Sequence, residues 1–126
     1  SEYLKRLRHY GGTELVIVKS GNQREEGERL LGASSGCFRV ALDEHGLQLT
    51  TADWKKRFDE ADNSSIKEFA WLIGGANGHL PETLSACDAR FAVSKLTLQH
   101  ELALIVLLEQ IYRVENWRRG EPYHRP

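Results

Sequence analysis

The residues best suited to chemistry fall into three short groups. Gly74, Gly75 and Gly78 follow an apolar run, residues 96–100 end at His100, and residues 123–125 read Tyr-His-Arg. Backbone at the C-terminal edge of a sheet, with no side chains in the way, can contact a flat cofactor. An imidazole can accept a proton and a guanidinium can bind an anion. Together these groups favour an enzyme.

The glycine run matches neither of two common phosphate-binding motifs. It lacks the lysine and the Ser/Thr of a P-loop, and its spacing differs from the dinucleotide fingerprint. Taken alone, it is equally compatible with a tight turn of no functional purpose. The second loop, 96–100, favours binding, because two backbone loops at neighbouring strand ends can hold an adenine or a ribose. Leu42, at the end of another predicted strand, would add an apolar wall.

His100 and the C-terminal tail each have two interpretations. His100 begins the last predicted helix, whose dipole disfavours a protonated imidazole; it either caps that helix or faces a substrate. A polar C-terminus is ordinarily frayed. Here Pro122 stiffens the approach to Tyr123, the residue types are costly choices for a disordered end, and the preceding helix is expected to be firmly anchored. We therefore favour a functional tail over a frayed one.

Metal chemistry and hydrolase chemistry have little support. The histidines show no paired spacing for a metal and the two cysteines do not complete a site, so we expect no metal. No serine lies in a nucleophile elbow. Cys37 and Cys87 are too few and too far apart for a disulfide framework, which predicts reduced thiols in a cytoplasmic protein.

The spacing of apolar residues predicts strands and helices that alternate along the chain. Strands are expected at 15–18, 37–42, 67–73 and 91–96, and helices at 3–9, 24–31, 52–61, 82–89 and 101–117. Thr51 is expected to cap the third helix, Pro81 to lie in the first turn of the fourth, and residues 43–46 to form a turn. This order predicts an α/β fold, with one mostly parallel, helix-covered sheet in a single domain of residues 1–126.

The composition of the chain limits the kinds of partner that we expect it to bind. The net charge of −1 and the pI of about 6.5 argue against nonspecific binding of nucleic acid. Basic residues nevertheless cluster near both ends, as Lys5, Arg6, Arg8, Arg113, Arg118, Arg119 and Arg125. Taken alone, these clusters are best interpreted as ordinary solvated faces, although they leave room for a local basic rim. The longest apolar stretch, 102–108, is too short to cross a membrane, so a soluble protein is expected. The helix at 101–117 has little polar face, which favours a dimer contact over burial within one chain.

Four ordered motifs then suggest a family. They are Leu-Ile-Gly-Gly-x-x-Gly at 72–78, Leu-Thr-Leu-x-His at 96–100, Glu-Gln-Ile-Tyr-Arg at 109–113 and Pro-Tyr-His-Arg at 122–125. Residues 2–7 and the turn at 42–46 also fit. Across its whole length the chain resembles the SPOUT-class family of ribosomal RNA large subunit methyltransferase H.

The resemblance implies a C-terminal trefoil knot, a homodimer, and cytoplasmic transfer of a methyl group from S-adenosylmethionine to N3 of a pseudouridine in 23S rRNA of assembled ribosomes. It implies that the cofactor is held by Leu42, Gly74, Gly75, Gly78, Val93, Ser94, Lys95, Leu96, Thr97 and Leu98. The catalytic and RNA-facing residues would be His100, Arg113, Tyr123, His124 and Arg125, with the tail acting across the dimer. His124 or His100 would accept the N3 proton.

The chain also departs from the family pattern. The family begins with a further strand and most of a helix, so either a truncated form or a sheet with one fewer strand and an exposed edge is expected. Gln99 replaces a usual proline, and Leu104 stands where arginine is common. These departures favour an alternative, a non-catalytic RNA- or ribosome-binding knotted module, whereas the intact tail argues against it. A same-class enzyme with another RNA target is a third possibility, since fold does not fix substrate.

Overall fold

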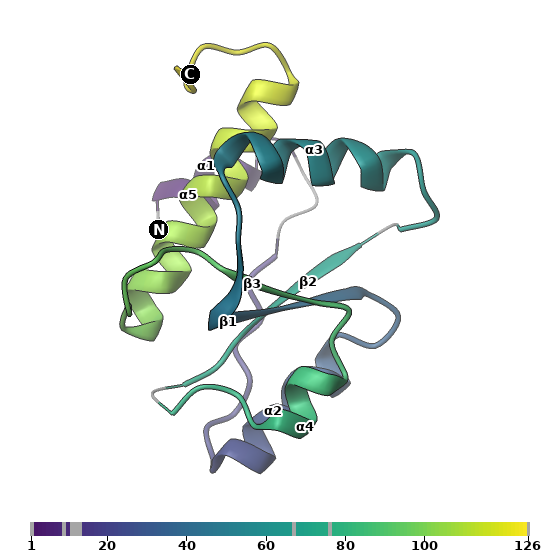
Figure 1. Ribbon diagram of the computed structural model, residues 1–126, viewed down its shortest axis with the longest axis vertical. Coiled ribbons are helices and arrows are strands. Elements are labelled where there is room, and N and C mark those ends of the chain that lie inside the picture. Colours follow the sequence, from purple (N-terminus) through teal and green to yellow (C-terminus); the bar gives the residue numbers. More distant parts are fainter. Residues whose placement is uncertain (1, 9, 11–13, 67, 76, 126) are drawn as a thin grey trace.

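The structure, a computed structural model, describes residues 2–8, 10, 14–66, 68–75 and 77–125. Helices and strands alternate along most of this chain (Figure 1). In order, the elements are α1 (Glu2–Arg8), α2 (Gln23–Ala33), β1 (Phe38–Gln48), α3 (Thr51–Asp62), β2 (Phe69–Ile73), α4 (Pro81–Ser85), β3 (Ala89–Ala92) and α5 (His100–Arg118).

The three strands form one parallel sheet in the order β2-β1-β3. In the register, Leu42 of β1 faces Ile73 of β2 and Phe91 of β3. The carboxyl ends of the three strands are thereby brought to one edge, where open α/β sheets bind ligands. The predicted parallel α/β sheet is confirmed.

Helices cover both faces of the sheet. In Figure 1, α1, α3 and α5 lie on one side, and α2 and α4 on the other. The α2–α4 contact is close because Gly27 of α2 leaves room for the buried side chain of Thr83; a Cβ at Gly27 would collide with its hydroxyl. Each face of the sheet is therefore packed, as its apolar strands require.

Capping residues set where the longer helices begin. Asn22 and Glu25 form a reciprocal capping box at α2, and Thr50 and Asp53 form another at α3. The cap of α3 is therefore Thr50, and the prediction of Thr51 was one residue late. Pro81 does occupy the first turn of α4, as predicted.

Strand β1 continues past the predicted turn. Residues 43–46 form a bulge, so that both Leu42 and Leu47 pair with Phe91. Gly46 permits this bulge, because a Cβ there would lie 2.8 Å from the carbonyl carbon and oxygen of Arg90. The turn that we expected to end the strand is thus an insertion within it.

The prediction of a buried strand at 15–18 was wrong. Residues 14–20 have no regular secondary structure, and Ile17 is 85% exposed. β-Branched residues favour a strand only when a neighbouring strand offers backbone partners. The described residues supply no such partner for this run.

Several predicted bounds also shift. Helix α4 ends at Ser85 and β3 runs over Ala89–Ala92, so residues 93–96, which we expected in the strand, belong to the loop that follows it. Helix α2 runs past Gly32, and α5 extends one residue beyond each predicted end. The predicted start of the third strand, residue 67, and the end of the first helix, residue 9, lie outside the described residues.

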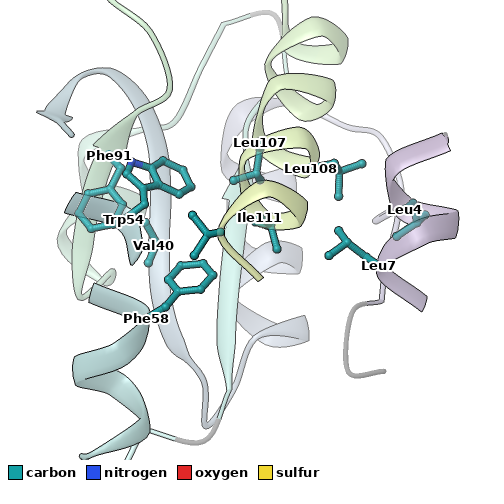
Figure 2. Close-up of a cluster of buried hydrophobic side chains, with 10 residues drawn as sticks. Leu4, Leu7, Val40, Trp54, Phe58, Phe91, Leu107, Leu108 and Ile111 are labelled. Carbon is teal, nitrogen blue, oxygen red and sulfur yellow. The ribbon is translucent and has the colours of Figure 1, made fainter. Parts of the chain in front are cut away.

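The main core lies between the sheet and the helices α1, α3 and α5. Val40, Trp54, Phe58 and Phe91 gather on one side of α5, and Leu4 and Leu7 of α1 lie on its other side (Figure 2). The Trp54 ring stacks on Trp71 of β2, with centroids 5.3 Å apart and planes within 3°. Burial of this apolar surface is the main stabilising contribution to the fold.

Helix α5 is covered by its own chain on more than one side. The sheet and α3 cover one side, and α1 covers another (Figure 2). Leu102 and Ile105 remain 47% and 45% exposed near the start of the helix. The apolar character of α5 is therefore partly explained within one chain, by a helix to which we had assigned no covering role.

Candidate functional site

The glycine loop begins where β2 ends. Gly74 follows Ile73 directly, and a Cβ at Gly74 would lie 2.9 Å from the carbonyl carbon of Gly78, so the loop closes on itself. Gly78 has a φ of 72°, a conformation that favours glycine. A Cβ at Gly78 would meet no atom within 4 Å, so the backbone there borders open space.

That open space is a cavity of about 450 Å³, within the range typical of small-molecule sites. We call it the glycine-loop cavity. Its lining residues come from the glycine loop, the start of α2 and the start of α5: Gly21, Asn22, Gln23, Glu26, Gly75, Asn77, Gly78 and His100. The structure thus brings His100 to the glycine loop. Gln99, not His100, caps α5 with its side chain.

The first turn of α2 fastens the loop. The Gln23 side-chain amide donates a hydrogen bond to the Asn77 carbonyl at 2.7 Å. Beyond the loop, His79 Nε2 donates to the Leu72 carbonyl at 2.9 Å, which ties the returning chain to β2. The α2 residues that line the cavity carry no signal in the sequence that we recognised. The capping box at Asn22 marks the start of a helix, but its position beside Gly75 arises only from the tertiary fold.

The other residues expected at the cofactor lie at the same sheet edge. Leu42 precedes the bulge in β1, and the loop 93–98 follows β3. Thr97 Oγ1 donates to Glu44 Oε2 at 2.9 Å and joins this loop to the bulge, while Leu96 is largely exposed. We predicted that the glycine loop and the loop at 96–100 follow neighbouring strands. That prediction was wrong, because β1 lies between β2 and β3 in the sheet.

The C-terminal residues dock on the end of α5. The Arg113 guanidinium lies 4.7 Å from the Tyr123 ring centroid, and Arg113 Nη1 is 3.2 Å from His124 Nδ1. The His124 ring also packs on Trp117, with centroids 4.5 Å apart. Arg113 Nε donates to Glu109 Oε1 at 2.6 Å. We call Glu109, Arg113, Trp117, Tyr123 and His124 the tail cluster.

Asn116 anchors the tail to the rest of the chain. Its side chain is only 3% exposed, and its Oδ1 accepts a hydrogen bond from the Tyr123 backbone N–H at 2.9 Å. Its Nδ2 donates to Tyr10 Oη and to Glu121 Oε2, both at 2.9 Å. Tyr10 also donates to Glu121 at 2.9 Å. These bonds hold the tail in an ordered position, as the functional interpretation requires.

Burial raises the pKa of Tyr123 to about 12, with hydrogen bonding to Tyr3 and the charge of Glu109 acting in the same direction. The phenol is therefore protonated at neutral pH, and its O–H donates to Glu109 Oε1 at 3.4 Å. Tyr123 can orient or contact a substrate, but it is not a base near pH 7.

The expected site residues form two groups at opposite ends of one helix. His100 is the first residue of α5, whereas Arg113 lies thirteen residues further on, which corresponds to about 20 Å along a helix. Figure 1 shows the tail beyond the far end of α5. One chain therefore does not bring the glycine-loop cavity and the tail cluster together.

Basic residues also lie on the elements that adjoin the tail cluster, α1 and the end of α5. Helix α1 packs against α5, so the basic groups at the two ends of the sequence become neighbours. Arg6 and Arg118 are paired with Glu2 and Asp59, at 3.0 Å and 2.8 Å. Among the described basic residues of α1 and of the segment from Arg113 onward, four are exposed and form no salt bridge with another described residue: Lys5, Arg8, Arg119 and Arg125.

The described residues offer neither a metal-binding group nor a membrane span. No three or more of their His, Cys, Asp or Glu side chains are placed together to hold a metal ion. No helix among these residues combines the length and the apolar character needed to cross a bilayer. Cys37 and Cys87 are free thiols, and burial raises the pKa of each.

The structure is an α/β fold with one parallel sheet, and the glycine-loop cavity lies at the carboxyl edge of that sheet, where open α/β sheets bind ligands. The sequence model described as "Predicted SPOUT methyltransferase" matches residues 1–124. The chain therefore belongs to the SPOUT methyltransferase family, and the resemblance noted in the sequence is confirmed.

Curated relatives match along nearly the whole chain. A protein of Thermus thermophilus is 43% identical over 125 residues, which cover 99% of this chain and 85% of the relative. One of Deinococcus deserti is 36% identical over 124 residues, covering 98% and 86%. One of Desulfotalea psychrophila is 35% identical over 132 residues, also covering 98% and 86%. Each is named ribosomal RNA large subunit methyltransferase H.

Proposed function

We propose that this protein transfers a methyl group from S-adenosylmethionine to N3 of a pseudouridine in 23S rRNA, acting on the assembled ribosome in the cytoplasm. Membership of the SPOUT methyltransferase family supports the reaction class. The names of the relatives support ribosomal RNA as the substrate. The observation that carries the proposal is the glycine-loop cavity with His100 in its wall.

The residues at this edge of the sheet fit the cofactor. The backbone at Gly78 borders open space, so its peptide groups can contact an adenosyl group closely. We propose that Leu42, Gly74, Gly75, Gly78 and the loop from Val93 to Leu98 (Val93, Ser94, Lys95, Leu96, Thr97, Leu98) hold it. When bound, the cofactor supplies an activated methyl group on a sulfonium, and the protein contributes orientation.

The tail cluster would receive the RNA. Arg113, Tyr123, His124 and Arg125 would contact the target nucleotide, because guanidinium groups bind phosphates and base carbonyls. The exposed basic residues of α1 and of the C-terminal segment, Arg8 and Arg119 among others, would extend this surface along the RNA backbone. His100 would lie beside the transferred group.

The separation along α5 supports a homodimer. With the cavity and the tail about 20 Å apart on one helix, a complete site would need the tail of a second copy beside the cavity of the first. The exposed Leu102 and Ile105 offer apolar surface for such a contact. We propose a homodimer of single SPOUT domains, residues 1–126, each with a C-terminal trefoil knot.

The direct test is incubation of the protein with labelled S-adenosylmethionine and ribosomes that lack the modification, followed by mapping of the labelled nucleotide. Label at N3 of one 23S rRNA pseudouridine is expected. Label at another RNA position would replace the proposed substrate. Absence of label, together with no binding of S-adenosylhomocysteine in a calorimetric titration, would favour a non-catalytic RNA-binding module.

A further inference from the structure

The contact between Arg113 and His124 fixes the hydrogen-bonding role of one imidazole nitrogen. Arg113 Nη1 lies 3.2 Å from His124 Nδ1. A guanidinium has only N–H donors and no acceptor. His124 Nδ1 must therefore accept the hydrogen bond with its lone pair.

The surrounding side chains hold this arrangement in place. Arg113 is oriented by its 2.6 Å bond to Glu109, and both side chains are largely buried, with 26% and 18% exposed. The guanidinium also stacks over Tyr123, whose backbone N–H is bound by Asn116. On its other side, His124 packs on Trp117. A shift of the His124 ring would break several of these contacts.

The role of Nδ1 determines the role of the other imidazole nitrogen of His124, Nε2. A neutral imidazole carries one N–H, and when Nδ1 is an acceptor the proton resides on Nε2. The Nε2 of His124 is then a hydrogen-bond donor. It forms no hydrogen bond within the described residues, and so it is available to a ligand.

We infer that His124 acts in the proposed methyl transfer as a hydrogen-bond donor through Nε2–H, and not as the acceptor of the N3 proton. This inference rests on the proposed function. As the carbon–sulfur bond breaks and the bond from carbon to N3 forms, the N3 proton leaves and negative charge develops on the adjacent base carbonyls. A fixed donor stabilises that charge. Of the two histidines considered, His100 then remains to take the proton.

Substitution of His124 distinguishes the two roles. The amide nitrogen of glutamine stands where Nε2 stood and can donate a hydrogen bond, but it cannot take up a proton at neutral pH. His124→Ala should lower kcat by about 100-fold or more, the effect of removing one such donor, and His124→Gln should recover at least about tenfold over alanine. Affinity for S-adenosylhomocysteine should not change in either variant.

A second measurement does not depend on activity. In protein with ¹⁵N-labelled histidine, imidazole ¹H–¹⁵N correlation spectra of the free protein should show His124 with an unprotonated Nδ1 and a protonated Nε2. A proton on Nδ1 would overturn the inference, as would a His124→Gln variant no more active than His124→Ala when the wild type is active. A wild type that neither binds S-adenosylhomocysteine nor transfers label would overturn the proposed function itself.

Discussion

Asn116 Oδ1 accepts a hydrogen bond from the backbone N–H of Tyr123 at 2.9 Å, and this bond fixes the tail on α5. Replacing Asn116 by alanine would leave the half-buried Tyr123 backbone N–H, Tyr10 and Glu121 without this partner. We expect Asn116→Ala to lower the free energy of unfolding by about 1–3 kcal/mol. The rate of methyl transfer should fall by more than the loss of folded protein would explain, because the tail cluster loses its position.

Urea denaturation and single-turnover methyl transfer measure these two effects. Asn63→Ala is a suitable control, since Asn63 is exposed and forms one side-chain hydrogen bond, of 3.2 Å, to the Asp59 carbonyl. Normal single-turnover rates in a folded Asn116→Ala protein would show that the tail does not need this anchor.

Two glycine substitutions, one in the β1 bulge and one in α2, should have opposite effects on the free energy of unfolding. Gly46→Ala would place a Cβ 2.8 Å from the Arg90 carbonyl, and overpacking of this kind costs about 1–3 kcal/mol. Gly32→Ala, in α2 with no atom within 4 Å of the new Cβ, should instead stabilise by about 0.5–1 kcal/mol. Chemical denaturation of both variants tests this pair, and equal stability of the two would contradict the account of the bulge.

The glycine loop can be tested through ligand affinity. Gly74→Ala would push its Cβ against the Gly78 backbone, at 2.9 Å, and so displace the loop. We expect the Kd for S-adenosylhomocysteine, measured by calorimetry, to rise at least about tenfold, equivalent to about 1.4 kcal/mol. Gly32→Ala serves again as the control. Unchanged affinity in Gly74→Ala would place the cofactor elsewhere.

Asp59 gives a pH-dependent prediction for the contact between α3 and α5. Its hydrogen bond from Lys55, and then that from Arg118, lower its pKa below the ordinary value of 3.8. A carboxyl with a lowered folded-state pKa stabilises the fold above its unfolded pKa, and this contribution is lost as the pH falls through the folded value.

Wild type should therefore exceed Asp59→Asn in stability at pH 6 to 7. The excess should be below about 1 kcal/mol, because the side chain is 43% exposed and its charge is screened. Thermal unfolding of both proteins across pH 2–7 should show the difference shrinking below about pH 4. A difference that grew in acid would contradict this assignment.

Elements that depend mainly on residues close in sequence could be predicted from the sequence. Apolar β-branched and aromatic runs located β1 and β2, and Pro81 located the first turn of α4. The sequence was insufficient where a distant partner decides the outcome. The run at 15–18 has the composition of a strand, but a strand forms only when another backbone pairs with it.

The candidate site likewise combines residues marked by local sequence patterns with residues placed by distant contacts. The glycine loop and the tail were visible as local patterns, and the structure shows each of them at the end of its predicted element. The α2 residues Gln23 and Glu26 and the anchor Asn116 were missed. Asn116 contacts Tyr10, 106 positions away in sequence, and no local pattern marks that pairing. Contacts of such long range arise from tertiary packing.

We propose that the glycine-loop cavity of one copy works with the tail cluster of another. The most direct test is to co-express Gly74→Ala and His124→Ala chains, each expected to be much less active than the wild type as a homodimer at subsaturating S-adenosylmethionine, and to measure methyl transfer to unmodified ribosomes under that condition. Half of the randomly mixed dimers would each hold one intact site, so about a quarter of wild-type activity is expected. Activity no greater than that of either variant alone would contradict a site shared between two copies.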